Sequence, residues 1–230
     1  PYGDLEAVKA QIDDQTCAIM VEPIQGEGGI RIPPPEFLAG LRELANQHGL
    51  LLIFDEVQSG CGRTGHWFAY QQFGVTPDVM TLAKSLCGGI AGGAMLTTPE
   101  IAPSLRPGMH AATFGGNPIA ARAGIATIET IEQENLLEHG LAMGELFQER
   151  LERLAHDSDL VQEVRVQGMM IGVELSAEGA PVVQSCLDRK LLLNCTQGTV
   201  IRLLPALNVT ADQVNEGIDI LTEALESYEV

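Results

Sequence analysis

The chain has 230 residues, 45% of them hydrophobic, which is enough apolar material for one large or two modest folded domains. Its 13 Lys and Arg residues against 31 Asp and Glu residues give a net charge of −18, so repulsion from phosphates excludes a nucleic-acid partner. No apolar run approaches the ~18–20 residues of a membrane-spanning helix and no basic-then-apolar leader opens the chain, so we expect a soluble, cytoplasmic protein without a membrane partner.

The side chains that commonly bind metals or form disulfides are scattered along the chain. The five cysteines include no C-x-x-C pair, and the five histidines never take the H-E-x-x-H spacing of a zinc site. We therefore expect neither a disulfide framework nor a metal site. Lysines are scarce, so the setting of each one is informative; they are Lys9, Lys84 and Lys190.

Three short apolar runs in the first hundred residues predict buried strands. Between the first two runs, apolar residues at helical spacing predict a helix that ends at Gly49. Strand, helix and strand with short links indicate a parallel sheet, whose ligands usually lie beyond the carboxyl ends of its strands. We expect three polar side chains at that edge: Glu22 after the run at 18–21, Asp55 after 50–54, and Lys84 after 79–83.

The second half of the chain predicts a further strand, several helices and a small C-terminal domain. The dipeptide Asn117-Pro118 is typical of a helix start and predicts a helix over 118–133. A longer helix over 137–155 leads into the second domain. The remaining predicted elements are strands at 93–97, on both sides of Gly168, at 191–195 and at 200–204, and a last helix that opens with a capping box at 210–213.

Two short motifs point to other chemistry. The segment GCGRTG at 60–65 matches the dinucleotide-binding pattern G-x-G-x-x-G, but that motif has its glycines directly at a strand's end, and residues 55–59 intervene here. The apolar run at 50–54 followed by Asp55 and Glu56 resembles the Walker-B strand of an ATPase, although no G-x-x-x-x-G-K-[ST] loop accompanies it. An ATPase therefore stays open as a distant alternative.

Asp55 and Lys84 follow two neighbouring predicted strands, and this pair suggests one particular cofactor. A partly desolvated lysine reacts as a free amine with the aldehyde of pyridoxal phosphate. A carboxylate on the adjacent strand can keep the pyridine nitrogen of that cofactor protonated, while Gln58 donates to its phenolic oxygen and Val57 packs on its ring. A solvated Lys84 at a strand end and a Val57 that only packs in the core are the alternatives.

Five segments together resemble the class III, or omega-amino acid, aminotransferases. They are VEPIQGEGG (21–29), FDEVQ (54–58), GRTG (62–65), LAKS (82–85) and TFGGNP (113–118). The resemblance implies a fold-type I pyridoxal-phosphate transferase, an α/β fold with a doubly wound large domain and a small C-terminal α/β domain. Residues 1–135 would be the C-terminal part of the large domain and residues 136–230 the small domain. The resemblance also implies a homodimer.

The resemblance assigns roles to the side chains that match the family's motifs. Lys84 matches the lysine that binds the cofactor covalently and Asp55 the partner of the pyridine nitrogen, so both would be catalytic. Val57 and Gln58 match the ring contacts. Thr113 matches a threonine that binds the cofactor phosphate of the neighbouring subunit, and it is the residue from which the dimer is expected.

Glu22 and Arg202 match a pair that handles the substrate carboxylate, whereas Ala112 stands where such enzymes commonly have a serine. The implied reaction moves the terminal amino group of N-acetylornithine to 2-oxoglutarate, as in arginine biosynthesis. Ornithine, succinylornithine and 4-aminobutyrate are the alternative donors. Family members are nearly twice as long, so we expect this chain to be the C-terminal part of such an enzyme. By itself we expect it to be an inactive fragment.

Overall fold

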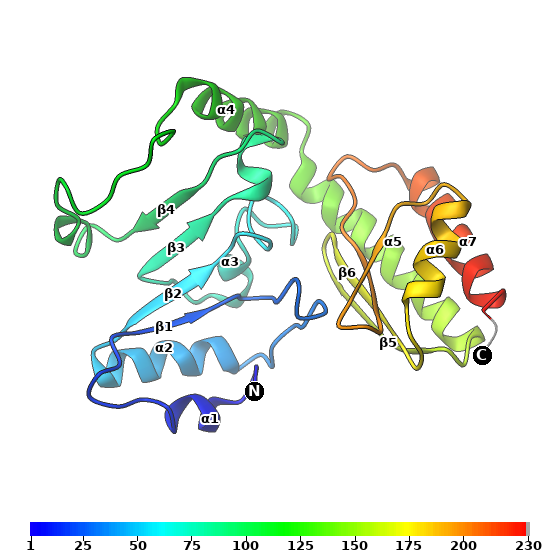
Figure 1. Cartoon of the computed structure of the whole chain (residues 1–230), viewed down its shortest axis with the longest axis horizontal. Coiled ribbons are helices and arrows are strands. Elements are labelled where there is room, and N and C mark those ends of the chain that lie inside the picture. The colour runs from blue at the N-terminus through cyan, green and yellow to red at the C-terminus, as the bar shows by residue number, and fades with distance from the viewer. Residues whose placement is uncertain (229–230) are drawn as a thin grey trace. The chain divides into compact units, whose positions relative to one another are not determined.

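The computed structural model describes residues 1–228, and the chain divides into two compact units. The first unit contains Pro1–Ile24, Pro33–Cys61 and His66–Glu134, whereas the second contains Gln25–Ile32, Gly62–Gly65 and the chain from Asn135 onward. Two short segments of the N-terminal half therefore belong to the second unit, which the sequence patterns did not indicate. Figure 1 labels the helices and strands in chain order.

The first unit is built on a four-stranded sheet with the order β1-β2-β3-β4 (Figure 1). Its first three strands are parallel, as predicted, and β4 runs antiparallel to β3. β2 begins and ends one residue later than its apolar run suggested, because Asp55 still pairs with Thr81 of β3. The strands are β1 (Ala18–Val21), β2 (Leu51–Asp55), β3 (Val79–Leu82) and β4 (Ala94–Thr97).

One helix of this unit supplies most of the apolar surface that the sheet buries. α2 (Phe37–His48) lies against β1 and β2, where its buried face packs around Leu52 and Phe54. Gly49 ends α2 with a φ of 68°, a left-handed conformation in which a side chain would be strained. The other helical elements are α1 (Leu5–Lys9), α3 (Ala69–Phe73), α4 (Pro118–Gln133) and the 3-10 turns η1 (Lys84–Cys87) and η2 (Ala102–Ser104).

The start of α4 confirms the predicted capping pattern. The side chain of Asn117 accepts a hydrogen bond from the backbone N–H of Ala120 at 2.9 Å, and Pro118 is the first helical residue. The helix ends at Gln133, as the sequence predicted. Because α4 packs on η1, it supports the turn that begins at Lys84.

The second unit is an antiparallel four-stranded sheet with the order β5-β6-β8-β7 and three helices. Figure 1 labels β5, β6 and the helices. Its core joins the inner faces of all three helices to β6 and β8, which are buried over most of their length. The strands are β5 (Val161–Gln167), β6 (Met170–Leu175), β7 (Asn194–Thr196) and β8 (Val200–Leu203). The helices are α5 (Leu136–Asp157), α6 (Ala180–Asp188) and α7 (Ala211–Glu226), of which α7 opens with the predicted capping box.

The predicted strand at 191–195 is mostly wrong, because only Asn194–Thr196 pairs with β8. Lys190 has a φ of 73°, which turns the chain after α6, and Leu192 is 84% exposed instead of lying in the sheet. The short helices α1, α3 and α6 were not predicted at all, since five to nine residues carry too little periodicity to recognise. Within residues 1–228, no helix combines the length and the apolar character needed to cross a membrane.

Candidate active site

Three polar side chains lie at one edge of the sheet in the first unit. Asp55 is the last residue of β2, Lys84 follows β3 after one intervening residue, and Glu22 directly follows β1. These strands are parallel neighbours, with Val21 opposite Phe54 and Asp55 opposite Thr81. The order of the strands therefore brings Glu22, Asp55 and Lys84 to the carboxyl edge, as the sequence predicted.

Lys84 has an unusual backbone conformation for a residue with a long side chain. Its φ is 42°, in the left-handed region that non-glycine residues rarely adopt, and it begins η1, which ends at Cys87 and is followed by the cap residue Gly88. Such a conformation costs on the order of 1–3 kcal/mol and is commonly found at functional sites. The backbone turns sharply here, so that Lys84 stands at the start of a turn and not within the strand.

The expectation that the Lys84 amine is partly desolvated is not met in this chain. Lys84 is exposed, and so are residues 88–91 of the glycine-rich segment that follows η1. Glycines have no side chains with which to cover a neighbouring amine. Any burial of Lys84 would therefore have to come from groups other than its own loop.

Asp55 also sets the conformation of the turn that follows it. Its Oδ1 atom accepts a hydrogen bond from the backbone N–H of Val57 at 3.0 Å, which ties the carboxylate to the start of the turn. Asp55, Val57 and Gln58 are all half-buried. The carboxylate, the valine and the amide predicted to surround a cofactor ring thus belong to one short, hydrogen-bonded segment at the sheet edge.

Sequence reasoning gave no role to Glu56, yet it is the most buried carboxylate of this segment. Its side chain is 1% exposed and accepts hydrogen bonds from Ser59, Ala69 and Tyr70. Burial raises the pKa of Glu56 above its ordinary value, although these hydrogen bonds act in the opposite direction. The only feature of the sequence that pointed to Glu56 was its position directly after Asp55. The same Asp-Glu pair also ends a Walker-B strand.

Thr113 and Ala112 lie in the irregular segment between η2 and α4, and both are exposed. Thr113 stands four residues before Asn117, the N-cap of α4. Its predicted contact with a cofactor phosphate in a neighbouring subunit stays a prediction.

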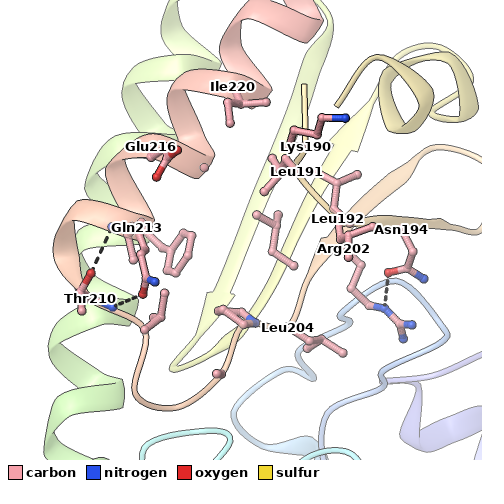
Figure 2. A pocket seen from close by; sticks show the side chains of 18 of the residues that line it. Lys190, Leu191, Leu192, Asn194, Arg202, Leu204, Thr210, Gln213, Glu216 and Ile220 are labelled. Atoms are coloured by element: carbon pink, nitrogen blue, oxygen red, sulfur yellow. Dashed lines mark hydrogen bonds between the residues drawn. The ribbon is translucent and has the colours of Figure 1, made fainter. Parts of the chain in front are cut away.

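Arg202 belongs to the second unit and is held there by a carboxylate that the sequence analysis did not select. Its side chain, in β8, is about nine-tenths buried, and Nη1 lies 2.8 Å from Oε1 of Glu27. Its Nε donates to the side-chain oxygen of Asn194 at 3.2 Å, as Figure 2 shows. The acidic partner of Arg202 in this unit is therefore Glu27, whereas we had expected Glu22; the contact of Glu22 with Arg202 stays a prediction.

Glu27 lies in Gln25–Ile32, and several hydrogen bonds hold that loop within the second unit. The hydroxyl of Thr196 and the side-chain amide of Gln197 both donate to the main-chain oxygen of Glu27. The buried Arg165 donates twice to the main-chain oxygen of Gly29, at 3.1 and 2.9 Å. One feature of the sequence could have pointed to Glu27. It is the second glutamate of the segment at 21–29 and directly precedes two glycines.

A cavity of about 940 Å³ opens in the second unit beside Arg202 (Figure 2). Its walls come from the segments around Leu191 and Leu204 and from the first turns of α7, where Thr210 and Gln213 form the capping box. Leu192 and Leu204 are both exposed beside it. Arg202 lines this cavity, whereas Asp55 and Lys84 do not. Within the described part of the chain, no three His, Cys, Asp or Glu side chains cluster closely enough to hold a metal ion.

A family model for class-III aminotransferases matches residues 2–225. The chain belongs to the class III aminotransferases. Among curated relatives, the acetylornithine aminotransferase of Methanothermobacter thermautotrophicus is 46% identical over 96% of this chain and 57% of its own length. The acetylornithine aminotransferase of Vibrio parahaemolyticus is 42% identical over 98% of this chain and 57% of its own length. The chain thus spans little more than half the length of these relatives.

Solved structures agree with this family and with the α/β fold. An ornithine aminotransferase from Plasmodium yoelii has a TM-score of 0.93 and 33% identity, over 98% of this chain and 62% of its own. An acetylornithine aminotransferase from Elizabethkingia anophelis has a TM-score of 0.92 and 32% identity, over 99% of this chain and 59% of its own. The family and its fold imply pyridoxal phosphate as cofactor. Family membership leaves the ATPase alternative without support.

The polar side chains at the sheet edge fit that cofactor. An amine at Lys84, a carboxylate at Asp55 and an amide at Gln58 follow adjacent parallel strands, and each is at least partly accessible. The hydroxyl of Thr81, which pairs with Asp55 across the sheet, is buried and has no hydrogen-bond partner among the described residues. These are the groups that can bind an aldehyde, a protonated ring nitrogen and a phenolic oxygen.

Proposed function

We propose that the protein containing this chain is a pyridoxal-phosphate-dependent aminotransferase that moves the terminal amino group of N-acetylornithine to 2-oxoglutarate. The observation that carries the proposal is the placement of Asp55 and Lys84 at adjacent strand ends, in a chain 46% identical to an acetylornithine aminotransferase. Seven further curated relatives of that name, at 41–45% identity, support the same donor.

Each residue at the sheet edge would have a separate task. When bound, pyridoxal phosphate supplies an electron sink that lets a proton leave the carbon bearing the amino group. The Nζ atom of Lys84 would hold the cofactor through its aldehyde and, once the substrate amine has displaced it, would serve as the base that moves this proton. The Asp55 carboxylate holds a proton at the ring nitrogen, Gln58 donates to the phenolic oxygen, and Val57 packs on one ring face.

Arg202 and Glu27 would let one pocket accept two different substrates. At its reacting carbon the omega-amino donor carries no carboxylate, whereas 2-oxoglutarate has one beside its reacting ketone. Arg202 binds that carboxylate, and Glu27 neutralises Arg202 when the donor is bound, as the 2.8 Å ion pair supports. Glu22, at the end of β1, remains the other candidate for this neutralising role.

We further infer a cytoplasmic homodimer in which Thr113 contacts the cofactor phosphate of the partner subunit. In that assembly residues 1–135, apart from Gln25–Ile32 and Gly62–Gly65, would belong to the cofactor-binding domain, and residues 136–230 to the small domain. The irregular, exposed segment around Thr113 supports the contact with a partner subunit, because a hydroxyl on such a segment is accessible to a second chain.

Ornithine is the second candidate donor. It is favoured by the structural similarity to ornithine aminotransferases from Plasmodium yoelii and Toxoplasma gondii, at 33% and 31% identity. The higher identity to acetylornithine aminotransferases favours the acetylated donor. Succinylornithine and 4-aminobutyrate remain to be compared with these two in the same assay.

The test uses the longer protein that contains this chain. It is purified with pyridoxal phosphate, and glutamate formation from 2-oxoglutarate is measured with N-acetylornithine, ornithine, succinylornithine and 4-aminobutyrate. We expect the highest kcat/KM with N-acetylornithine and no hydrolysis of ATP. A preference for another of these amines would correct the donor, and absence of cofactor binding would overturn the proposal.

A further inference from the structure

The buried carboxylate of Glu56 has no part in the chemistry proposed above, yet it stands between two residues that do. Asp55 precedes it and Val57 follows it in the chain. Glu56 is 1% exposed, whereas Asp55, Val57 and Gln58 are all partly accessible. A charged side chain is seldom buried unless its oxygens are hydrogen-bonded, so the partners of Glu56 show what it does.

The Glu56 side chain joins the turn after β2 to the beginning of α3. Its Oε2 atom accepts hydrogen bonds from the Ser59 hydroxyl at 2.7 Å and from the backbone N–H of Ala69 at 2.9 Å. Its Oε1 atom accepts from the backbone N–H of Tyr70 at 2.8 Å. One carboxylate therefore joins Ser59 to Ala69 and Tyr70, which lie ten and eleven positions further along the chain.

The backbone of Glu56 is fixed as well. Its N–H donates to the main-chain oxygen of Thr81 in β3 at 3.0 Å, and its own oxygen accepts from the N–H of Gly60 at 2.9 Å. Gly60 has no room for a side chain, since a Cβ there would lie 2.8 Å from that same oxygen of Glu56. The far end of the turn over 57–60 is thus held closely against Glu56, whose own N–H is bonded to β3.

These contacts determine where Asp55 and its turn can lie. The Asp55 carboxylate bonds to the Val57 N–H at 3.0 Å, so any movement of the turn carries Asp55 with it. We propose that Glu56 is a positioning residue that, by tying the turn over 57–60 to the start of α3, sets the orientation of Asp55 toward the ring nitrogen of the cofactor. This inference rests on the proposed function of Asp55.

A carboxylate suits this position better than its amide. Three donors converge on its two oxygens, and both oxygens must accept. In Glu56→Gln one oxygen becomes an NH₂ group, which faces the N–H of either Ala69 or Tyr70 and leaves that donor unsatisfied. The side chain keeps its size, so the change removes the tie without opening a cavity.

The experiment measures cofactor binding in the longer protein that contains this chain. The probes are pyridoxal phosphate and its carbocyclic analogue, in which C–H replaces the ring nitrogen and which therefore has nothing for Asp55 to bind. For Glu56→Gln we expect the Kd for pyridoxal phosphate to rise about tenfold, whereas the Kd for the analogue changes by less than about twofold. Equal weakening of both probes would overturn the proposal, because it would show a merely structural role.

Two further variants keep the result decisive. Ser59→Ala removes one donor from the carboxylate, and we expect it to shift the Kd for pyridoxal phosphate in the same direction by a smaller factor; it replaces Glu56→Gln if that variant does not fold. Glu43→Gln, on the exposed face of α2, is the matched control and should leave both Kd values unchanged.

If the unaltered protein binds no pyridoxal phosphate, the proposed function fails. If it binds but neither Glu56→Gln nor Ser59→Ala discriminates between the probes, only the positioning role fails.

Discussion

Arg202 and Glu27 form an ion pair of 2.8 Å although 175 positions of sequence separate them. The arginine lies in a strand of the second unit, and the glutamate lies in a loop that interrupts the first unit in sequence. The pair is asymmetric: the Arg202 side chain is 9% exposed and the Glu27 side chain 68%. Burial therefore restricts the Arg202 side chain, whereas the exposed Glu27 side chain has room to change its conformation.

This asymmetry predicts a change of specificity in Glu27→Gln of the longer protein. With the neutralising charge gone, reaction with glutamate should become faster and reaction with the omega-amino donor slower, by about tenfold in their ratio. Single-turnover absorbance of each half-reaction measures this. Glu22→Gln is the matched comparison, and it should change the ratio less. A larger effect at Glu22, or an equal loss in both half-reactions at Glu27, would contradict the assignment.

Lys84 is predicted to be the residue that binds the cofactor covalently. Borohydride reduction followed by peptide mass mapping should place the pyridoxyl label on Lys84, because it alone among the lysines follows a strand at the carboxyl edge of the sheet. Lys84→Ala should lose the label and lower turnover by several orders of magnitude. Label on Lys9 or Lys190 would refute the prediction.

How much of this site was predictable depends on how local the determining contacts are. The positions of Asp55 and Lys84 followed from apolar runs that end at polar residues, since strand order alone brings parallel ends together. The role of Glu27 did not follow, because its loop is held by hydrogen bonds from Arg165 and Thr196, far along the chain. The exposure of Lys84 was also missed, since a strand pattern says nothing of what covers the strand's end.

Helices were likewise predictable only where their determining contacts are local in sequence. The predicted bounds of α4 agree with the observed ones, because its Asn-Pro start is a local signal. α3 has only five residues, and its first N–H groups are satisfied by Glu56, thirteen positions upstream of Ala69. No pattern within Ala69–Phe73 contains that information.

The isolated chain is predicted to self-associate through the sheet of the first unit. β1 and β4 are both edge strands, and the adjacent residues Met95 and Leu96 of β4 are 53% and 43% exposed although they point to opposite faces. Met95→Lys should reduce association, because a charged side chain on an edge strand disfavours pairing with a second chain. Sedimentation velocity at several concentrations measures the effect. A monodisperse monomer of residues 1–230 would contradict this prediction.

Glu56 should give the stability of the protein a distinct dependence on pH. Because burial raises its pKa in the folded chain, the folded state retains a proton that the unfolded chain has already released. The contribution of Glu56 to the free energy of unfolding is therefore greatest below about pH 4.3, the ordinary value for a glutamate, and falls as pH rises through the raised pKa.

Urea unfolding of the longer protein and of its Glu56→Gln variant between pH 4 and 7 measures this contribution. Glutamine does not titrate, so the difference in unfolding free energy between the two proteins should vary over this interval. A difference that stays constant with pH would show that the carboxylate does not titrate there.

The chain passes back and forth between its two units before Asn135, since Gln25–Ile32 and Gly62–Gly65 belong to the second unit. Arg63 donates to the main-chain oxygen of Pro205, and its own oxygen accepts from the N–H of Met169. Truncation near residue 135 would consequently remove the Gly29 oxygen that Arg165 binds and the Arg63 side chain that binds the oxygen of Pro205. A fragment that begins near residue 135 would therefore lack two segments that belong to the second unit.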